Sequence, residues 1–201
     1  IYTAPPRWLM DLCLRHGLKI MADLPWTNHV AFLNEKKNIK EITRKVRNTA
    51  RSIANHPALL CYSVGNEIPA SIVRYHGKKR IESFIRDLYH NVKSEDPNSL
   101  VTYVNYPTTE YLELPFLDIV CFNVYLESKD AFDSYITRLH NIAYNRPLII
   151  SEIGLDSCRN GLEKQSAVIN WQLSTCFASG CAGSFVFQWT DEWFRGGNNI
   201  T

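Results

Sequence analysis

Leu59-Leu60-Cys61-Tyr62-Ser63-Val64-Gly65-Asn66-Glu67 is the stretch that decides the fold. Most of its residues are apolar, as in a parallel strand that is buried on both faces, and Pro69 cannot continue a central strand. The pattern therefore predicts a buried strand with Glu67 at its carboxyl end. The segment 146–152, Arg-Pro-Leu-Ile-Ile-Ser-Glu, repeats this arrangement and ends in Glu152. Two carboxylates at the ends of two parallel strands are a candidate catalytic pair.

Composition and charge limit the classes of protein to which this chain can belong. With 201 residues, 45% of them hydrophobic, the chain can form one domain with a substantial core. The net charge is +2 and acidic and basic residues are interspersed, so there is no basic patch of the kind that binds nucleic acid. No apolar run approaches the roughly 18 residues of a membrane span. We expect a globular domain with no membrane segment and no nucleic-acid partner.

The six cysteines do not form a recognisable metal site or disulfide framework. No CxxC motif and no Cys/His cluster with metal-ligand spacing occurs, so we expect no bound metal. Cys158 and Cys181 lie near predicted loops and are the only pair for which a disulfide stays open. Free thiols are expected at the other four positions, Cys13, Cys61, Cys121 and Cys176. Mostly free thiols favour a reducing compartment.

Helical and strand patterns alternate along the chain. Apolar residues at helical spacing predict helices over 5–16, 39–53, 81–92, 132–142 and 162–177. Short apolar runs predict strands over 18–24, 59–67, 100–105, 117–125, 146–152 and 183–189. This alternation predicts a parallel sheet covered by helices.

Two closures of such a sheet are possible. A doubly wound open sheet usually binds phosphate through a Gly-rich loop, and neither GxGxxG nor GxxxxGK[ST] occurs here. A (β/α)8 TIM barrel instead gathers its chemistry at the carboxyl ends of its strands. The sequence places polar or aromatic residues at such ends, namely Glu67, Asn105, Tyr125, Glu152 and Trp189. We therefore predict an α/β fold of the TIM-barrel type.

The predicted barrel is partial. A barrel has eight strands and takes about 250 residues, whereas this chain has six predicted strands in 201 residues. We expect strands three to eight to be present, and the first two strand–helix units and the last helix to be missing. Residues 1–201 then form a single, partial barrel domain.

Two motifs resemble those of a known enzyme clan. Ser63-Val64-Gly65-Asn66-Glu67 resembles the fourth-strand Asn-Glu motif of the clan A retaining glycoside hydrolases, and Ser151-Glu152-Ile153-Gly154 resembles their seventh-strand nucleophile motif. The segment 55–67 is similar to the Asn-His-Pro-Ser and Trp-Ser-x-Gly-Asn-Glu pattern of glycoside hydrolase family 2, which includes β-galactosidases, β-glucuronidases and β-mannosidases. Tyr62 stands where that family usually has Trp. The first two strands, where the clan often has a sugar-binding Arg, are not among the predicted ones.

The resemblance implies a retaining hydrolase that cleaves O-glycosidic bonds, those of β-glycosides, and needs no cofactor. Glu67 would be the general acid/base and Glu152 the nucleophile, and retention requires the two carboxyl groups to lie roughly 5 to 5.5 Å apart. Tyr125 would donate a hydrogen bond to Glu152 and keep it aimed. Asn66 would bind the sugar 2-hydroxyl and Trp189 would form an apolar floor. Further candidates for the wall of the carbohydrate site are Trp26, His29 and Asn105. The family resemblance also implies additional N-terminal domains.

Other interpretations remain open at this stage. A carbohydrate-binding barrel without turnover, serving polysaccharide assembly or processing, would keep the same fold. A doubly wound binding or regulatory domain would make the two glutamates unrelated. Asp191 and Glu192 are rival carboxylates, and Asp23 is a possible hydrogen-bonding group at the rim of the barrel.

Overall fold

The computed structural model describes residues 1–190, and it divides into two compact units, Ile1–Val120 and Cys121–Thr201. Each unit is described by itself. The rival carboxylates Asp191 and Glu192 and the Gly-rich segment 195–199 lie outside the described residues. That residues 1–201 form a single domain stays a prediction.

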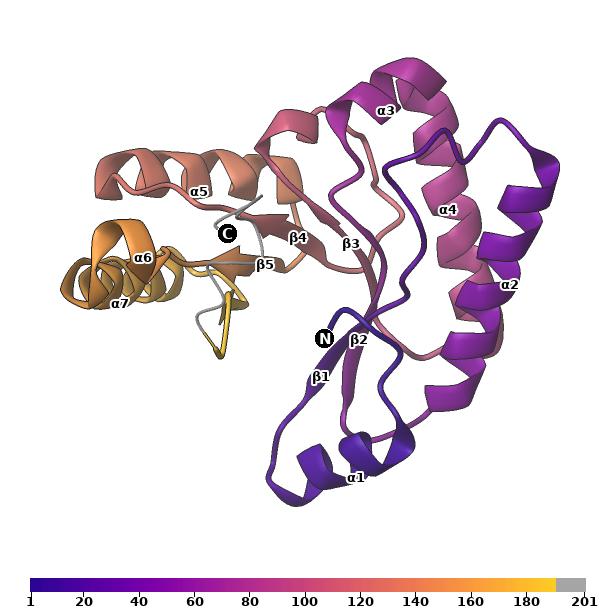
Figure 1. Ribbon diagram of the computed structural model, residues 1–201, viewed down its shortest axis with the longest axis horizontal. Helices are drawn as coiled ribbons and strands as arrows, with labels where there is room; N and C mark the ends of the chain where they lie inside the picture. Colours follow the sequence, from indigo (N-terminus) through magenta and orange to yellow (C-terminus); the bar gives the residue numbers. More distant parts are fainter. Residues whose placement is uncertain (191–201) are drawn as a thin grey trace. The chain divides into compact units, whose positions relative to one another are not determined.

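The first unit is built on three parallel strands. Its elements in chain order are α1 (Arg7–Arg15), β1 (Ile20–Asp23), α2 (Lys36–Ile53), β2 (Leu59–Asn66), α3 (Ala70–His76), α4 (Lys78–Glu95), β3 (Val101–Asn105) and the 3-10 turn η1 (Pro107–Thr109). The strands pair in the order β1-β2-β3, with Ala22 opposite Tyr62 and Tyr62 opposite Val101. Helices α2 and α4 lie side by side along them (Figure 1). This is strand–helix repetition with parallel pairing, as expected for part of a barrel.

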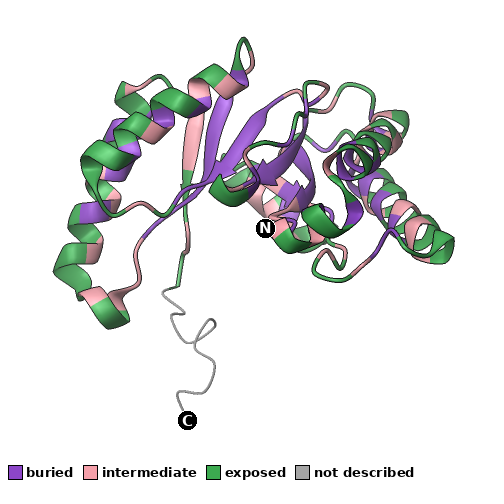
Figure 2. Ribbon diagram, turned by 90° about the horizontal axis from the view of Figure 1, so that it is seen from above, coloured by how far each residue is buried: buried purple, intermediate pink, exposed green. Residues whose placement is uncertain are grey.

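The helices of this unit cover the sheet with one apolar face each. In α2 the buried residues are Ile42, Val46, Ala50 and Ile53, spaced three or four apart, as required for one face of a helix. Residues 61–65 of β2 are buried throughout. Figure 2 shows most strand residues in the colour of buried residues and much of the helices in the colour of exposed ones. The continuous apolar pattern of β2 is therefore that of a strand covered on both faces.

Tyr62, which replaces the expected tryptophan, is fully buried together with its hydroxyl group. The hydroxyl oxygen lies 3.0 Å from Asp96 Oδ2 and 3.1 Å from the Ala50 carbonyl oxygen. Asp96 is itself buried and also accepts a hydrogen bond from the Asn55 backbone N–H. A buried hydroxyl without a partner would destabilise the fold, so Asp96 explains why tyrosine is tolerated here.

The second unit repeats the same construction. Strand β4 (Val120–Asn123) starts at the last residue of the first unit and is followed by α5 (Lys129–Ala143), β5 (Leu148–Ile153), α6 (Ser157–Asn160), α7 (Leu162–Ala178) and β6 (Gly183–Val186). The Val124 N–H donates to the Glu152 carbonyl at 2.8 Å, so the end of β4 lies beside β5. Strands β5 and β6 are parallel, with Ile150 opposite Ser184. Helix α5 packs beside α7 (Figure 1).

All six predicted strands are present, but some boundaries and short helices differ. Strand β6 ends at Val186, so Trp189 lies beyond it rather than in the predicted strand 183–189. The helices α3 and α6, of seven and four residues, were not predicted. They are too short for a helical period to show in the sequence. All six cysteines are free thiols. No helix among residues 1–190 is long and apolar enough to cross a membrane.

Candidate active-site residues

Glu67 directly follows β2 and has an unusual backbone conformation. Its φ angle is +46°, in the left-handed region that non-glycine residues rarely adopt. Its N–H donates to the Val104 carbonyl of β3 at 3.0 Å, and the next N–H, of Ile68, donates to the Tyr103 hydroxyl at 2.9 Å. The residue is half-buried. The chain thus leaves β2 by a strained turn that two neighbouring bonds to β3 hold in place, and such strain is a frequent feature of functional sites.

The loop after β1 lies against this turn. Trp26 donates from its indole Nε1 to the Val64 carbonyl at 2.9 Å, and Asn28 donates from its side-chain amide to the Asn66 carbonyl. The structure therefore places Trp26 against Val64, two residues before Asn66, and the contact with Asn66 itself is made by Asn28. Asn28 lies between the predicted strand 18–24 and the predicted helix 39–53 and is not among the predicted site residues. His29 follows it in the loop and is exposed, so its role in a carbohydrate site stays a prediction.

Asn105 lies at the carboxyl end of β3, as predicted, and is 5% exposed. Its amide nitrogen donates to the Thr109 carbonyl at 3.1 Å, while its amide oxygen accepts hydrogen bonds from the Tyr106 N–H and the Thr109 hydroxyl. These bonds hold the turn that contains η1. The described contacts of the Asn105 side chain are structural, and its assignment to the wall of a sugar site stays a prediction.

Asp23, the last residue of β1, has a carboxyl group that is largely shielded from water. Burial raises its pKa to about 6, and a hydrogen bond with the Ser63 hydroxyl only partly opposes this rise. Within the described residues its Oδ1 atom is buried without a hydrogen-bond partner. The carboxylate is therefore an unfavourable form here, and ionisation destabilises the folded state.

The raised pKa of Asp23 predicts that this carboxyl group makes the folded state less stable as pH rises, the reverse of a carboxyl group whose pKa is lowered by folding. The folded-state pKa of about 6 lies above the ordinary value of 3.8 for an Asp side chain, so between these pH values the folded chain binds more protons than the unfolded chain and stability falls as pH rises. The shift in pKa corresponds to a change of at most about 3 kcal/mol in the free energy of unfolding. We expect Asp23→Asn to remove this fall in urea unfolding at pH 4 to 7. Asp87→Asn, on the exposed face of α4, is the matched control and should follow the parent. If the unfolding free energies of the parent and of Asp23→Asn changed in parallel with pH, the prediction would be wrong.

Glu152 lies within β5, one residue before its end, and is 8% exposed. The Tyr125 hydroxyl donates a hydrogen bond to Glu152 Oε2, which is the contact that the family resemblance implies for these two residues. The preceding Ser151 hydroxyl donates to Asn123 Oδ1 at 2.8 Å, which ties β5 to β4. The structure therefore brings Tyr125 and Glu152 together and fixes the strand that carries the carboxylate.

Gly154 is the last residue of the motif 151–154, and the structure explains why this residue is glycine. A Cβ atom at this position would lie 2.5 Å from the Phe187 carbonyl oxygen, closer than any real Cβ contact. The backbone after β6 passes there because the Phe187 N–H donates to the Ile153 carbonyl at 2.8 Å. A side chain at residue 154 would push these two segments apart. The glycine is thus required by close backbone approach next to Glu152.

A family model described as "Glycosyl hydrolases family 2, TIM barrel domain" matches residues 2–194. The chain belongs to glycosyl hydrolase family 2. This confirms the resemblance found in the motifs and the prediction of a TIM-barrel fold. The match covers both units of this family 2 chain.

Relatives and solved structures agree with this assignment. The β-glucuronidase of Felis catus is 26% identical over 172 residues, and that of Homo sapiens is 25% identical over 174 residues; each match covers 74% of this chain and 24% of the relative. Bacteroides uniformis β-glucuronidase has a similar structure, with a TM-score of 0.77 and 20% identity over 90% of this chain and 24% of that one. The family 2 β-galacturonidase of Eisenbergiella tayi bound to galacturonate has a TM-score of 0.75 and 18% identity, over 97% of this chain and 38% of that one. At these identities the solved structures show the fold alone. The family 2 chain spans about a quarter of the length of the curated relatives it matches.

Trp189, the predicted apolar floor, lies three residues beyond β6, and its side chain is fully exposed. Among the described residues nothing packs on its ring, so its predicted contact with a sugar stays a prediction. The sequence pattern placed it at a strand end because Phe185 and Phe187 extend the apolar run. The strand itself stops earlier.

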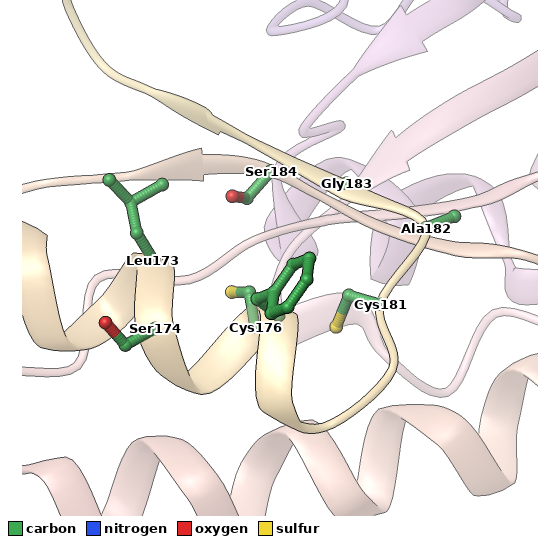
Figure 3. Close-up of a pocket in the computed structure, with 8 residues that line it drawn as sticks. Leu173, Ser174, Cys176, Cys181, Ala182, Gly183 and Ser184 are labelled. Atoms are coloured by element: carbon green, nitrogen blue, oxygen red, sulfur yellow. The ribbon is translucent and has the colours of Figure 1, made fainter.

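The hollow shown in Figure 3 is not the candidate active site of this family 2 chain. Its volume is about 510 Å³, and it lies between the last turns of α7 and the start of β6, with Cys176 and Cys181 in its lining. The Cys181 Sγ lies 4.0 Å from His140 Nε2, and an interaction with the Cys176 thiol lowers the pKa of Cys181. Because β5 and β6 are parallel, the amino end of β6 lies away from the carboxyl end of β5, where Glu152 is found. The hollow therefore belongs to the opposite end of these strands.

Proposed function

We propose that this chain supplies the catalytic barrel residues of a retaining β-glycosidase that acts on glycosides of uronic acids. One observation carries the proposal: in a chain of glycosyl hydrolase family 2, Glu152 lies at the end of a buried strand with the Tyr125 hydroxyl bonded to its carboxylate. Glu67, after another strand and in a strained turn, supplies the second carboxyl group.

The proposed reaction is a double displacement. Glu152 attacks the anomeric carbon while Glu67 gives its proton to the glycosidic oxygen, so the leaving alcohol departs and a covalent glycosyl-enzyme forms. Glu67, now a carboxylate, takes a proton from water, whose oxygen attacks the same carbon and releases Glu152. The hydrogen bond from Tyr125 keeps the carboxylate of Glu152 aimed between these steps. Two substitutions on one carbon return the original β configuration.

The proposed substrate class comes from the relatives. The matched proteins of Felis catus and Homo sapiens are β-glucuronidases, and the structural neighbour from Eisenbergiella tayi is a β-galacturonidase bound to galacturonate. Glucuronic and galacturonic acid share a carboxylate on the sugar ring. A β-linked hexuronic acid is thus the substrate that these similarities favour.

Hydrolysis of p-nitrophenyl β-D-glucuronide by the full protein, beside the matching galacturonide, galactoside and mannoside, tests the proposal. We expect the glucuronide or galacturonide to react fastest, and proton NMR to detect the β anomer of the sugar first. First appearance of the α anomer would contradict retention. Sugar binding by calorimetry, with no hydrolysis of any of these glycosides, would instead favour a carbohydrate-binding barrel without turnover.

A further inference from the structure

The loop after β1 follows β2 closely and ends at the turn that carries Glu67. Three of its residues at alternate positions donate hydrogen bonds to β2: the Leu24 N–H to Ser63 O at 2.9 Å, Trp26 Nε1 to Val64 O at 2.9 Å, and the Asn28 amide to Asn66 O. The first donor is backbone and the next two are side chains. Beyond the end of β1, side chains therefore continue the ladder that the backbone began.

The last of these bonds acts on one particular peptide group. The carbonyl of Asn66 and the N–H of Glu67 belong to the same planar peptide. The carbonyl accepts the hydrogen bond from the Asn28 amide, while the N–H donates to Val104 O at 3.0 Å. Both polar ends of this peptide are thus held, one by the loop after β1 and the other by β3. Its plane sets the direction in which the Glu67 side chain leaves the backbone.

This peptide needs external support because of the conformation that follows it. Glu67 has a φ of +46°, and the left-handed region is sterically disfavoured for residues other than glycine. Such a conformation persists only when its surroundings impose it. Trp26 adds to the support, since its ring lies 3.2 Å from where a Cβ on Gly65 would be. A Cβ at residue 65 would be in tight contact with the ring, so glycine lets the ring lie close to this segment.

We infer that Asn28 is a positioning residue for the general acid: its side-chain amide fixes the Asn66–Glu67 peptide and so aims the Glu67 carboxyl group at the leaving oxygen. This inference rests on the proposed function. Asn28 does not touch the reacting atoms in this scheme and acts through the backbone. Misplacement of a catalytic group by about 1 Å can lower a rate about 100-fold.

The loop has other anchors, so loss of Asn28 has a local effect. The Leu33 N–H donates to His76 Nε2 at 3.4 Å, Arg80 donates to the Leu33 carbonyl, and Asn34 Nδ2 donates to the Tyr75 hydroxyl at 2.9 Å. These bonds tie the far end of the loop to α3 and α4. Asn34→Ala is therefore a matched control, because it removes the same kind of side chain and one hydrogen bond from the same loop.

The kinetic test compares leaving groups in the full protein. A general acid assists departure of a poor leaving group and contributes little for one that departs without a proton. For Asn28→Ala we expect kcat/KM to fall about 10-fold to 100-fold on a phenyl β-glycoside, and less than about 3-fold on the 2,4-dinitrophenyl β-glycoside of the same sugar. Asn34→Ala should stay near the parent on both. An equal loss on both substrates, or no loss, would overturn the inference.

A second measurement does not depend on activity. Hydrogen–deuterium exchange of the peptide that covers residues 62–68 should be faster in Asn28→Ala than in the parent and in Asn34→Ala. Unchanged exchange there would overturn the inference, even if the parent hydrolysed no glycoside and the proposed function failed. Asn28→Leu, which keeps the side-chain size without a donor, provides both readouts if the alanine variant does not fold. An active parent with a leaving-group effect in Glu67→Gln but not in Asn28→Ala would leave the function standing and refute only the positioning role.

Discussion

Glu152→Ala is expected to lower turnover of an aryl β-glucuronide by the full protein on the order of 10⁴-fold or more, the scale of loss when an enzyme's nucleophile is removed. Without the carboxylate no glycosyl-enzyme forms, and the Tyr125 hydroxyl loses its acceptor. The variant also leaves space beside the anomeric carbon. Azide should enter this space, attack from the side of the missing carboxylate and yield the α-glycosyl azide. The initial rates and the anomeric configuration of the azide product are the measurements.

Glu127→Ala is a suitable control for this experiment. Glu127 is an exposed glutamate in the same unit, paired with Lys164 at 3.0 Å, and exposed ion pairs contribute little to stability. Its replacement should leave turnover within about 2-fold of the parent. If Glu152→Ala kept near-parental turnover, Glu152 would not be the nucleophile. A β-glycosyl azide would place the missing carboxylate on the other face of the sugar.

The sequence predicted the strands of this fold well because burial on both faces leaves a clear pattern. The run from Leu59 to Gly65 has no polar alternation, and residues 61–65 are buried. Prediction was weaker where local signals are short. Helix α3 follows Pro69 and has seven residues, less than the length over which a helical period shows. Strand β6 stops at Val186 although the sequence continues with apolar residues.

The candidate site was predicted where it depends on strand ends and not where it depends on loops. Glu67 and Glu152 could be singled out because each ends an apolar run. The bond from Tyr125 to Glu152 was expected from the family resemblance. Asn28 could not be selected from the sequence, because it lies in a loop that has no periodic pattern. Its role depends on a hydrogen bond to Asn66, which is 38 positions further along the chain. Asn105 shows the converse, because its strand-end position concealed a structural role in the next turn.

Glu67→Gln is expected to give the second largest effect, and it depends on the substrate. Glutamine keeps the size of the side chain but has no proton to donate to the leaving oxygen, and general acid catalysis contributes about 10²- to 10⁴-fold. We expect kcat/KM on a phenyl β-glycoside to fall by that factor. On the 2,4-dinitrophenyl β-glycoside, whose leaving group departs without a proton, the fall should be below about 10-fold.

The pH profile of Glu67→Gln separates loss of the acid from loss of folding. A general acid makes kcat/KM of the parent decrease at high pH, as the acid loses its proton. The variant should lack this decrease for the phenyl substrate, whereas a partly unfolded enzyme would keep the shape of the profile at a lower level. Glu35→Gln, on the exposed N-terminal side of α2, is the control and should reproduce the parent profile. Glu67 is held in a left-handed turn by hydrogen bonds from the loop after β1 and to β3. If the variant's pH profile had the same shape as the parent's, this strained turn would position something other than the catalytic acid.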